Sequence, residues 1–199
     1  MEIPTKSTLL WQRALRLNDF AGGNWWQQIL QSSIDYPGKL QRLTNGICEQ
    51  LKGRFREVCQ HAIKAKPHHT VPKYFLIFAS RHPDALRLMN DQMVKSRNAL
   101  AELAKPKEPT LFETRSTDLV PDADRLSSLI PKHCAQPTRR GDVILNVIRE
   151  NFCEYSVRQI RGYIETMLKD GRLTSETRRA TINDNTKIHV AARPCRPRN

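Results

Sequence analysis

The segment from Ser156 to Gly171 constrains the fold most strongly, because it carries the start, stripe and stop signals of a single helix. Ser156 is a favoured N-cap residue, and Gly171 suits the left-handed conformation in which many helices end. Between them, apolar residues recur at steps of three and four, as on one face of a helix. The stripe consists of Val157, Ile160, Ile164 and Leu168. The segment therefore predicts an amphipathic helix with one buried face.

The elements expected around this helix follow a recognisable order. A short apolar helix is closed by Pro131, and a second helix is predicted over 138–152. Two strand-like runs, 172–175 and 187–190, come after the capped helix and are joined by a basic, polar loop. Helix, helix, capped helix and hairpin is the order of a winged helix-turn-helix domain. We therefore predict such a domain over residues 121–192.

The charge of the chain gives the first functional indication. The formal net charge is +13, and a basic surface attracts polyanions such as nucleic acids. On the capped helix, Arg158, Gln159 and Arg161 lie near the N-terminal end, where Arg pairs with guanine and Gln with adenine. Arg178 and Arg179 in the loop suit phosphate contacts. The predicted nucleic-acid-binding residues are Ser156, Arg158, Gln159, Arg161, Arg172, Arg178, Arg179, Lys187 and Arg193.

An alternative reading of the same surface stays open. Winged helices also serve as protein–protein modules, in which Arg158 and Arg161 would pair with Glu165 and Asp170 on a solvated helix face. The basic loop between the two strands, which is called the wing in this class of domain, suits the phosphate backbone of DNA and of RNA alike. The pattern therefore leaves open the kind of nucleic acid and its sequence.

The first half of the chain is predicted to form a separate domain over residues 1–104. A helix ends at Gly22-Gly23, a second is capped by Asn24, and a third begins at Tyr36-Pro37 with an apolar stripe that runs to Val58. A β-hairpin near 59–80 and a further helix from Pro83 follow. The predicted fold class is therefore α+β, mostly α-helical.

The second strand of this hairpin raises a packing problem. Its sequence, YFLIFA over 74–79, is almost continuously apolar, as expected for a strand buried on both faces. One hairpin and the helices before it do not easily cover both faces, so we expect either a helix that returns over the strand or another chain that completes the sheet. Residues 105–120 are predicted as a linker, because they combine prolines and charges with little periodicity, and 193–199 as a basic tail.

Two segments together resemble a known family. "KYFLIFASRHPDALRLMNDQM" at 73–93, followed by "LFE" at 111–113 and "LKDGRL" at 168–173, resembles the C-terminal half of the three-Cys-motif partner proteins. The resemblance implies a prokaryotic protein, associated with mobile elements or antiviral defence, with a methyltransferase-like Rossmann domain before a winged helix. A glycine-rich turn for S-adenosylmethionine is missing from this sequence. The first domain is then expected to be a partial Rossmann-like remnant.

The remaining chemistry indicates binding and not catalysis. No nucleophile, paired carboxylate or cofactor loop stands out, and the histidines around the hairpin lack acidic ligands at suitable spacing, so we expect no cofactor and no metal. The odd number of cysteines without C-x-x-C spacing and the lack of a long apolar run favour a reducing cytoplasm and no membrane partner.

We therefore expect a non-enzymatic nucleic-acid-binding protein whose first domain docks onto a larger prokaryotic assembly. The alternative is a subunit of a multi-chain enzyme or ribonucleoprotein complex whose active site lies in another polypeptide. In that case the winged helix would be used for protein contact.

Overall fold

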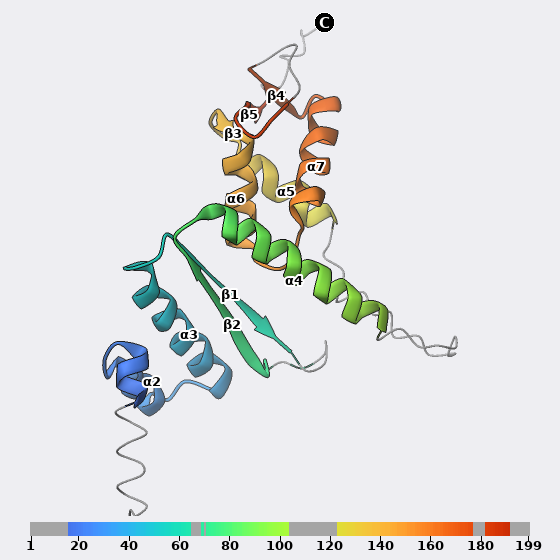
Figure 1. Cartoon of the computed structure of the whole chain (residues 1–199). Helices are drawn as coiled ribbons and strands as arrows, with labels where there is room; N and C mark the ends of the chain where they lie inside the picture. The colour runs from blue at the N-terminus through green and yellow to red at the C-terminus, as the bar shows by residue number, and fades with distance from the viewer. Residues whose placement is uncertain (1–15, 65–68, 70, 104–122, 177–181, 192–199) are drawn as a thin grey trace, which may run out of the picture. The chain divides into compact units, whose positions relative to one another are not determined.

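A computed structural model describes residues 16–64, 69, 71–103, 123–176 and 182–191. These residues form an α+β fold that is mostly helical, with one β-hairpin and a second small sheet. The chain divides into two compact units, Met1–Arg81 and His82–Asn199 (Figure 1). Each unit has its own sheet.

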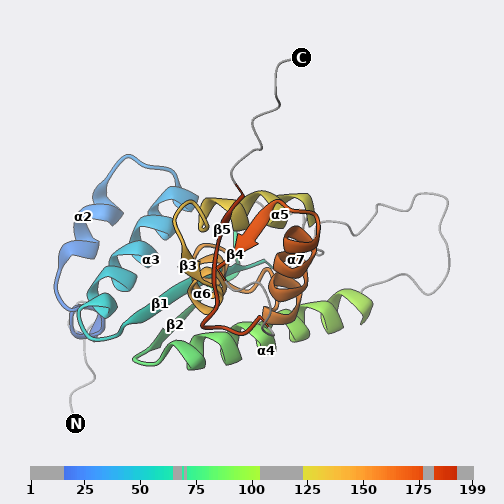
Figure 2. The same cartoon turned by 90° about the horizontal axis from the view of Figure 1, so that it is seen from above.

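In its described residues, the N-terminal unit combines helical residues 16–21, which stop before Gly22-Gly23 as predicted, with two further helices and the hairpin. Its elements are α2 (Trp25–Gln31), α3 (Tyr36–Lys52), β1 (Glu57–Ile63) and β2 (Tyr74–Ser80). The strands pair antiparallel along their full length, which confirms the predicted hairpin. Helix α3 packs against the hairpin, as Figures 1 and 2 both show.

Helix α3 begins where the sequence predicts and ends earlier. Asp35 is its N-cap and accepts a hydrogen bond from the Gly38 backbone N–H, and Pro37 lies in its first turn. The apolar stripe was expected to continue to Val58, and this prediction is wrong. The helix ends at Lys52, with Gly53 as its C-cap, and Val58 already belongs to β1. The spacing of three and four continued by chance across the turn between the two elements.

Tryptophan packing joins α2 to α3. The Trp25 ring lies directly against Gly46 of α3, where a Cβ atom would collide with it. The Trp25 indole N–H donates to the Ala21 carbonyl at 2.8 Å, and the Trp26 indole N–H donates to the Asn18 side chain at 2.8 Å. Asn24 is the N-cap residue of α2, as predicted, but its side chain makes no capping hydrogen bond.

Strand β2 is less buried than its sequence suggests. Tyr74 is exposed and the other six residues of β2 are only partly buried, so the prediction of a strand buried on both faces is wrong. The physical reason is that, in the described part of this unit, the sheet has two strands and the layer packed on it is the single helix α3, which covers β2 incompletely. Within the unit, α3 packs on one face, where the Gln60 side chain donates to the Asn45 side chain at 2.7 Å.

In its described residues, the C-terminal unit has four helices and a three-stranded sheet. Its elements are α4 (Pro83–Leu103), α5 (Ala123–Lys132), β3 (Thr138–Arg139), α6 (Arg140–Glu150), α7 (Val157–Lys169), β4 (Leu173–Ser175) and β5 (Lys187–Val190). The sheet order is β3-β5-β4, with both pairs antiparallel. The helices α5, α6 and α7 enclose the core below this sheet (Figure 1). Fully buried core side chains include Leu126, Ile130, Ile144, Ile148, Ile160, Ile164, Met167, Leu173 and Ile188.

Three helix boundaries in this unit and one residue of the α7 stripe differ from the sequence-based expectation. One of these boundaries is the end of α6 at Glu150, two residues before the predicted end. Helix α5 continues past Pro131 to Lys132. The second helix starts at Arg140, because Thr138 and Arg139 pair with β5 as a short strand. On α7, Met167 replaces Leu168 in the fully buried stripe. The predicted linker at 105–120 and the tail at 193–199 lie outside the described residues.

Helix α4 is clamped to the turn between α6 and α7. Asn90 is fully buried, and its side chain donates to the Tyr155 carbonyl at 2.8 Å and accepts from the Cys153 N–H at 2.9 Å. Arg97 donates to the carbonyls of Cys153 and Glu154 at 2.7 and 2.9 Å. These bonds hold Cys153 at a φ of 69°, which is unusual for a residue with a side chain. The unit boundary accordingly falls before α4, whereas the sequence placed this helix in a domain ending at residue 104.

Candidate nucleic-acid interface

The N-terminus of α7 carries a complete capping box. The Gln159 backbone N–H donates to Ser156 Oγ at 3.2 Å, and the Ser156 N–H donates to Gln159 Oε1 at 2.9 Å. Ser156 is therefore the N-cap, as predicted. The Gln159 side chain, which was predicted to contact a base, is part of the same capping box. Bidentate pairing of Gln159 with adenine needs both ends of its amide, so that contact would break the capping box.

A carboxylate of α4 also binds the N-terminal end of α7. Asp91 Oδ1 of α4 accepts a hydrogen bond from the Val157 N–H at 2.8 Å. A negative group near the first turn of a helix is favourable, because the unpaired N–H groups carry partial positive charge. The first backbone donor of α7 is therefore satisfied within the unit.

Among the predicted site residues that the structure describes, Arg158 is the most available for an external ligand. Its side chain is exposed in the first turn of α7. Within the described part of the chain, it has neither an ion pair nor a hydrogen bond. In the alternative interpretation, Arg158 would pair with Glu165 or Asp170, but both carboxylates pair with other arginines. Glu165 lies 3.7 Å from Arg140, and Asp170 lies 3.8 Å from Arg172.

Arg161, the third predicted base-reading residue, is bound to a residue of the loop between β4 and β5. Its Nη2 donates to Asp184 Oδ2 at 2.7 Å, and 41% of its side chain is exposed. Neither Glu165 nor Asp170 is its partner, in contrast to the pairing considered from the sequence. Reading a base with Arg161 would require this bond to break.

Asp184 is the centre of a larger cluster that the sequence did not reveal. Besides Arg161, Arg140 Nη2 donates to its carboxylate at 3.2 Å and Arg87 Nη1 at 3.4 Å. The Asp184 carbonyl accepts from the Gly141 N–H at 2.8 Å. A Cβ at position 141 would lie 3.1 Å from that carbonyl oxygen and 3.0 Å from Arg87 Nη2, so glycine permits this close approach.

Three arginines lower the pKa of the Asp184 carboxyl group. Partial burial acts to raise the pKa of this carboxyl group, but the hydrogen bond from Arg161 and the charges of Arg161, Arg140 and Arg87 outweigh it. The pKa of Asp184 therefore lies below its ordinary value of 3.8. The carboxylate is charged at neutral pH and binds the three guanidinium groups as an anion.

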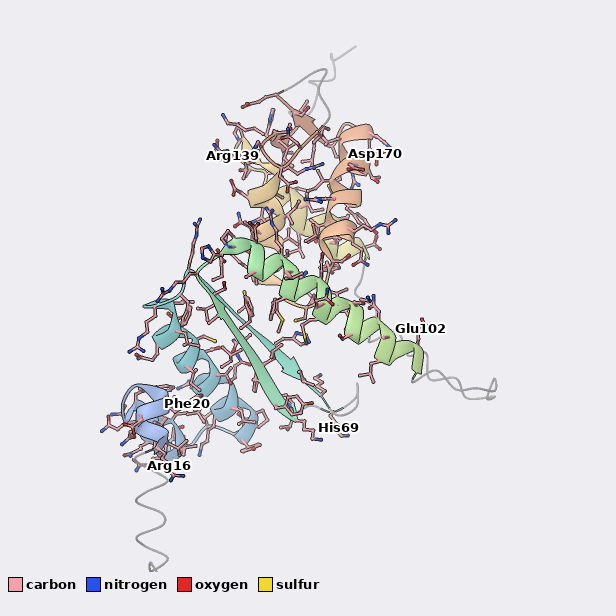
Figure 3. The ribbon with its side chains drawn as sticks, in the orientation of Figure 1. Arg16, Phe20, His69, Glu102, Arg139 and Asp170 are labelled. Atoms are coloured by element: carbon pink, nitrogen blue, oxygen red, sulfur yellow. The ribbon has the colours of Figure 1, made fainter. Side chains whose placement is uncertain are left out.

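The remaining predicted residues surround the sheet. Arg172 and Lys187 are half exposed, with weak ion pairs to Asp170 at 3.8 Å and to Glu176 at 3.7 Å. Arg139 in β3 is also exposed and was not predicted, because its position before a helix gives no special signal. Figure 3 shows Arg139 near that end of the C-terminal unit where the three-stranded sheet lies. Three predicted residues, Arg178, Arg179 and Arg193, lie outside the described ranges.

The described residues contain no group of three or more His, Cys, Asp or Glu side chains arranged to hold a metal ion. None of the helices in the described ranges has the length and apolar character needed to cross a membrane.

Comparison of the chain with known protein families, with curated proteins and with solved structures gives no match.

Proposed function

We propose that residues 123–191 form a winged helix-turn-helix domain. The element order α5, β3, α6, α7, β4, β5 and the sheet order β3-β5-β4 support this assignment. Helices α6 and α7 then make the helix-turn-helix, with α7 as its recognition helix, and the loop between β4 and β5 makes the wing. Helix α4 is an addition that holds the turn before α7 in place.

The domain binds nucleic acid mainly through backbone phosphates. The observation that carries this proposal is that the polar side chains of α7 differ in their partners. Arg158 is exposed and has no hydrogen bond or ion pair in the described part of the chain, whereas the side chains of Gln159 and Arg161 are hydrogen-bonded within the unit. Half-exposed Lys187 and Arg172 add positive charge beside the sheet. Phosphate contacts position a protein without reading sequence, so binding is only weakly sequence-specific. The role is one of binding, with no catalytic step.

Salt-dependent binding by the full-length chain tests this function. Fluorescence anisotropy with labelled duplex and single-stranded DNA and RNA measures affinity between low and physiological salt. Replacement of one phosphate-binding arginine reduces the slope of log K against log salt by about 0.9 for duplex DNA. We expect this change for Arg158→Gln.

The matched control is Arg42→Gln, which removes the same charge from an exposed position on α3 of the N-terminal unit. A nucleic-acid site at α7 predicts a clear loss for Arg158→Gln and almost none for Arg42→Gln. Equal losses would mean that binding follows net charge alone, and no binding by the wild-type chain would exclude the function.

The N-terminal unit supports a second part of the proposal, which is docking onto a protein partner. Strand β2 is apolar along most of its length but only partly buried, and it has one strand neighbour in the described part of the unit. A strand from another chain could add to the edge of β2, and the partner that carries this strand could pack on its apolar side chains. A partial Rossmann-like remnant, as the family resemblance implies, would have this need.

Copurification tests this second part and the alternative of a complex subunit. Affinity purification from a native host, with and without nuclease, separates protein-mediated from nucleic-acid-mediated association. A stoichiometric protein that survives nuclease supports docking. A chain that elutes alone as a monomer contradicts it.

A further inference from the structure

Three arginines from different helices converge on one carboxylate in the C-terminal unit. Arg87 of α4, Arg140 at the start of α6 and Arg161 of α7 form what we call the arginine triad, and Asp184 lies at its centre. The side chain of Arg140 is only 9% exposed, although an arginine is rarely buried to this extent without strong partners. The triad is therefore a built site and not a set of chance surface contacts.

The triad has more donors than Asp184 satisfies. The Nε–H groups of Arg87, Arg140 and Arg161 are all buried, and none has an acceptor among the described residues. Two further carboxylates face the triad from its rim: Glu165 lies 3.7 Å from Arg140 and is 54% exposed, and Asp84 lies 3.6 Å from Arg87 and is 88% exposed. Such exposed pairs are weak and screened, so the inner anion is Asp184.

A phosphate group matches this donor set better than a carboxylate does. Guanidinium groups bind phosphate oxygens in bidentate fashion, and a tetrahedral phosphate offers acceptors in more directions than a planar carboxylate. An anion that replaces Asp184 would therefore keep the charge balance of the triad. It would also supply acceptors for N–H groups that now lack them.

The Asp184 side chain can leave the triad without unfolding its turn. Main-chain bonds hold the turn on α6: the Gly141 N–H donates to the Asp184 carbonyl at 2.8 Å, and the Arg140 N–H donates to the Thr186 carbonyl at 2.9 Å. The Asn185 N–H also donates to Asn183 Oδ1 at 2.9 Å within the turn. Rotation about the Cα–Cβ bond of Asp184 is then enough to move its carboxylate away.

We propose that the arginine triad is a phosphate-binding site that Asp184 occupies in the free chain, and that a backbone phosphate of bound nucleic acid takes the place of the Asp184 carboxylate. The choice of nucleic acid as ligand rests on the proposed function. Asp184 thus acts as an internal competitor that keeps Arg161 masked until a phosphate arrives.

The test replaces the competitor in the full-length chain. Asp184→Asn removes the charge and keeps the shape, and Asp170→Asn is the matched control, because it adds the same net charge at an exposed carboxylate that pairs only weakly with Arg172. We expect Asp184→Asn to tighten oligonucleotide binding about fivefold near 0.1 M salt and to steepen the salt slope by up to about 0.9. Asp170→Asn raises the net charge equally but frees only Arg172, so it should tighten binding clearly less than Asp184→Asn does.

A second substitution shows whether the gain depends on the triad. When Arg161→Gln is added, the tightening caused by Asp184→Asn should shrink markedly, since the two residues act on one site. The proposal is overturned if Asp184→Asn weakens binding or matches Asp170→Asn, which would make Asp184 a structural link only. It is equally overturned if the gain persists in full without Arg161.

A readout that needs no nucleic acid separates this site from the proposed function. Titration with inorganic phosphate is followed by NMR on the arginine Nε–H resonances, assigned with Arg87→Lys, Arg140→Lys and Arg161→Lys variants. We expect the triad resonances to shift, and to shift at lower phosphate concentration in Asp184→Asn. Unchanged triad resonances in both chains refute the site. If the wild-type chain shows the phosphate-dependent shifts but does not bind the oligonucleotide, only the nucleic-acid function is refuted.

Discussion

The buried side chain of Asn90 offers the sharpest test of how α4 supports the C-terminal unit. Asn90→Ala removes the donor to the Tyr155 carbonyl and the acceptor of the Cys153 N–H, at 2.8 and 2.9 Å. Both backbone groups then stay buried without these partners, at roughly 1–3 kcal/mol each. The substitution should therefore lower the free energy of unfolding by about 2–5 kcal/mol. At a typical urea dependence, this lowers the midpoint by about 1 M or more.

The assay must separate the two units. All three tryptophans precede residue 27, so tryptophan fluorescence follows the N-terminal unit, whereas far-UV circular dichroism follows the helices of both. Asn90→Ala should shift the dichroism transition of the C-terminal unit and leave the fluorescence transition unchanged. Asn98→Ala is the control on the same helix, because Asn98 is exposed and its side chain accepts a hydrogen bond from the neighbouring Arg97 at 3.3 Å. Its effect should stay within about 0.7 kcal/mol.

Equal midpoints for Asn90→Ala and Asn98→Ala would refute the reasoning. That result would mean that the turn before α7 holds its conformation without α4. The assignment of α4 to the C-terminal unit would then lose its energetic basis. A fluorescence shift as large as the dichroism shift would also contradict it, since Asn90 would then stabilise the whole chain.

Two further predictions concern the surroundings of Asp184. Gly141→Ala should destabilise the C-terminal unit by about 1–3 kcal/mol, since its Cβ would be 3.0–3.2 Å from Arg87 and Asp184, whereas Gly162→Ala, with no atom within 4 Å, should stabilise α7 by up to about 1 kcal/mol; urea unfolding compares them. Because the pKa of Asp184 is lowered, its charged form contributes stability above pH 3.8 that is lost as pH falls through the lowered pKa. Acid unfolding should therefore be steeper in wild type than in Asp184→Asn, and identical curves would contradict the ion pairs.

Local signals in the sequence predicted the elements well. The cap at Ser156 and the left-handed residue Gly171, with a φ of 70°, bound α7 as expected, because both signals act within one helical turn. The hairpin was found for a similar reason, since alternation and turn residues are properties of adjacent positions. The end of α3 was missed because an apolar period does not show where the backbone stops being helical.

The partners of the site residues could not be predicted in this way. Asp184 is separated from Arg161, Arg140 and Arg87 by 23, 44 and 97 positions. Charge patterning along a helix compares residues three or four apart, so it pointed to Glu165 as the partner of Arg161. Only the tertiary fold brings the loop before β5 onto the start of α6.

The availability of each arginine, and not the number of arginines, determines what the basic C-terminal unit can bind. Arg97 donates to two carbonyls of the turn before α7, and Arg87 and Arg161 donate to Asp184. A formal charge of +13 therefore overstates the charge that a ligand meets at low cost. Arg158 pays no such cost, because its guanidinium has no partner in the described part of the chain. If phosphate is the ligand, first contact falls to residues such as Arg158, and the triad contributes only after Asp184 has moved.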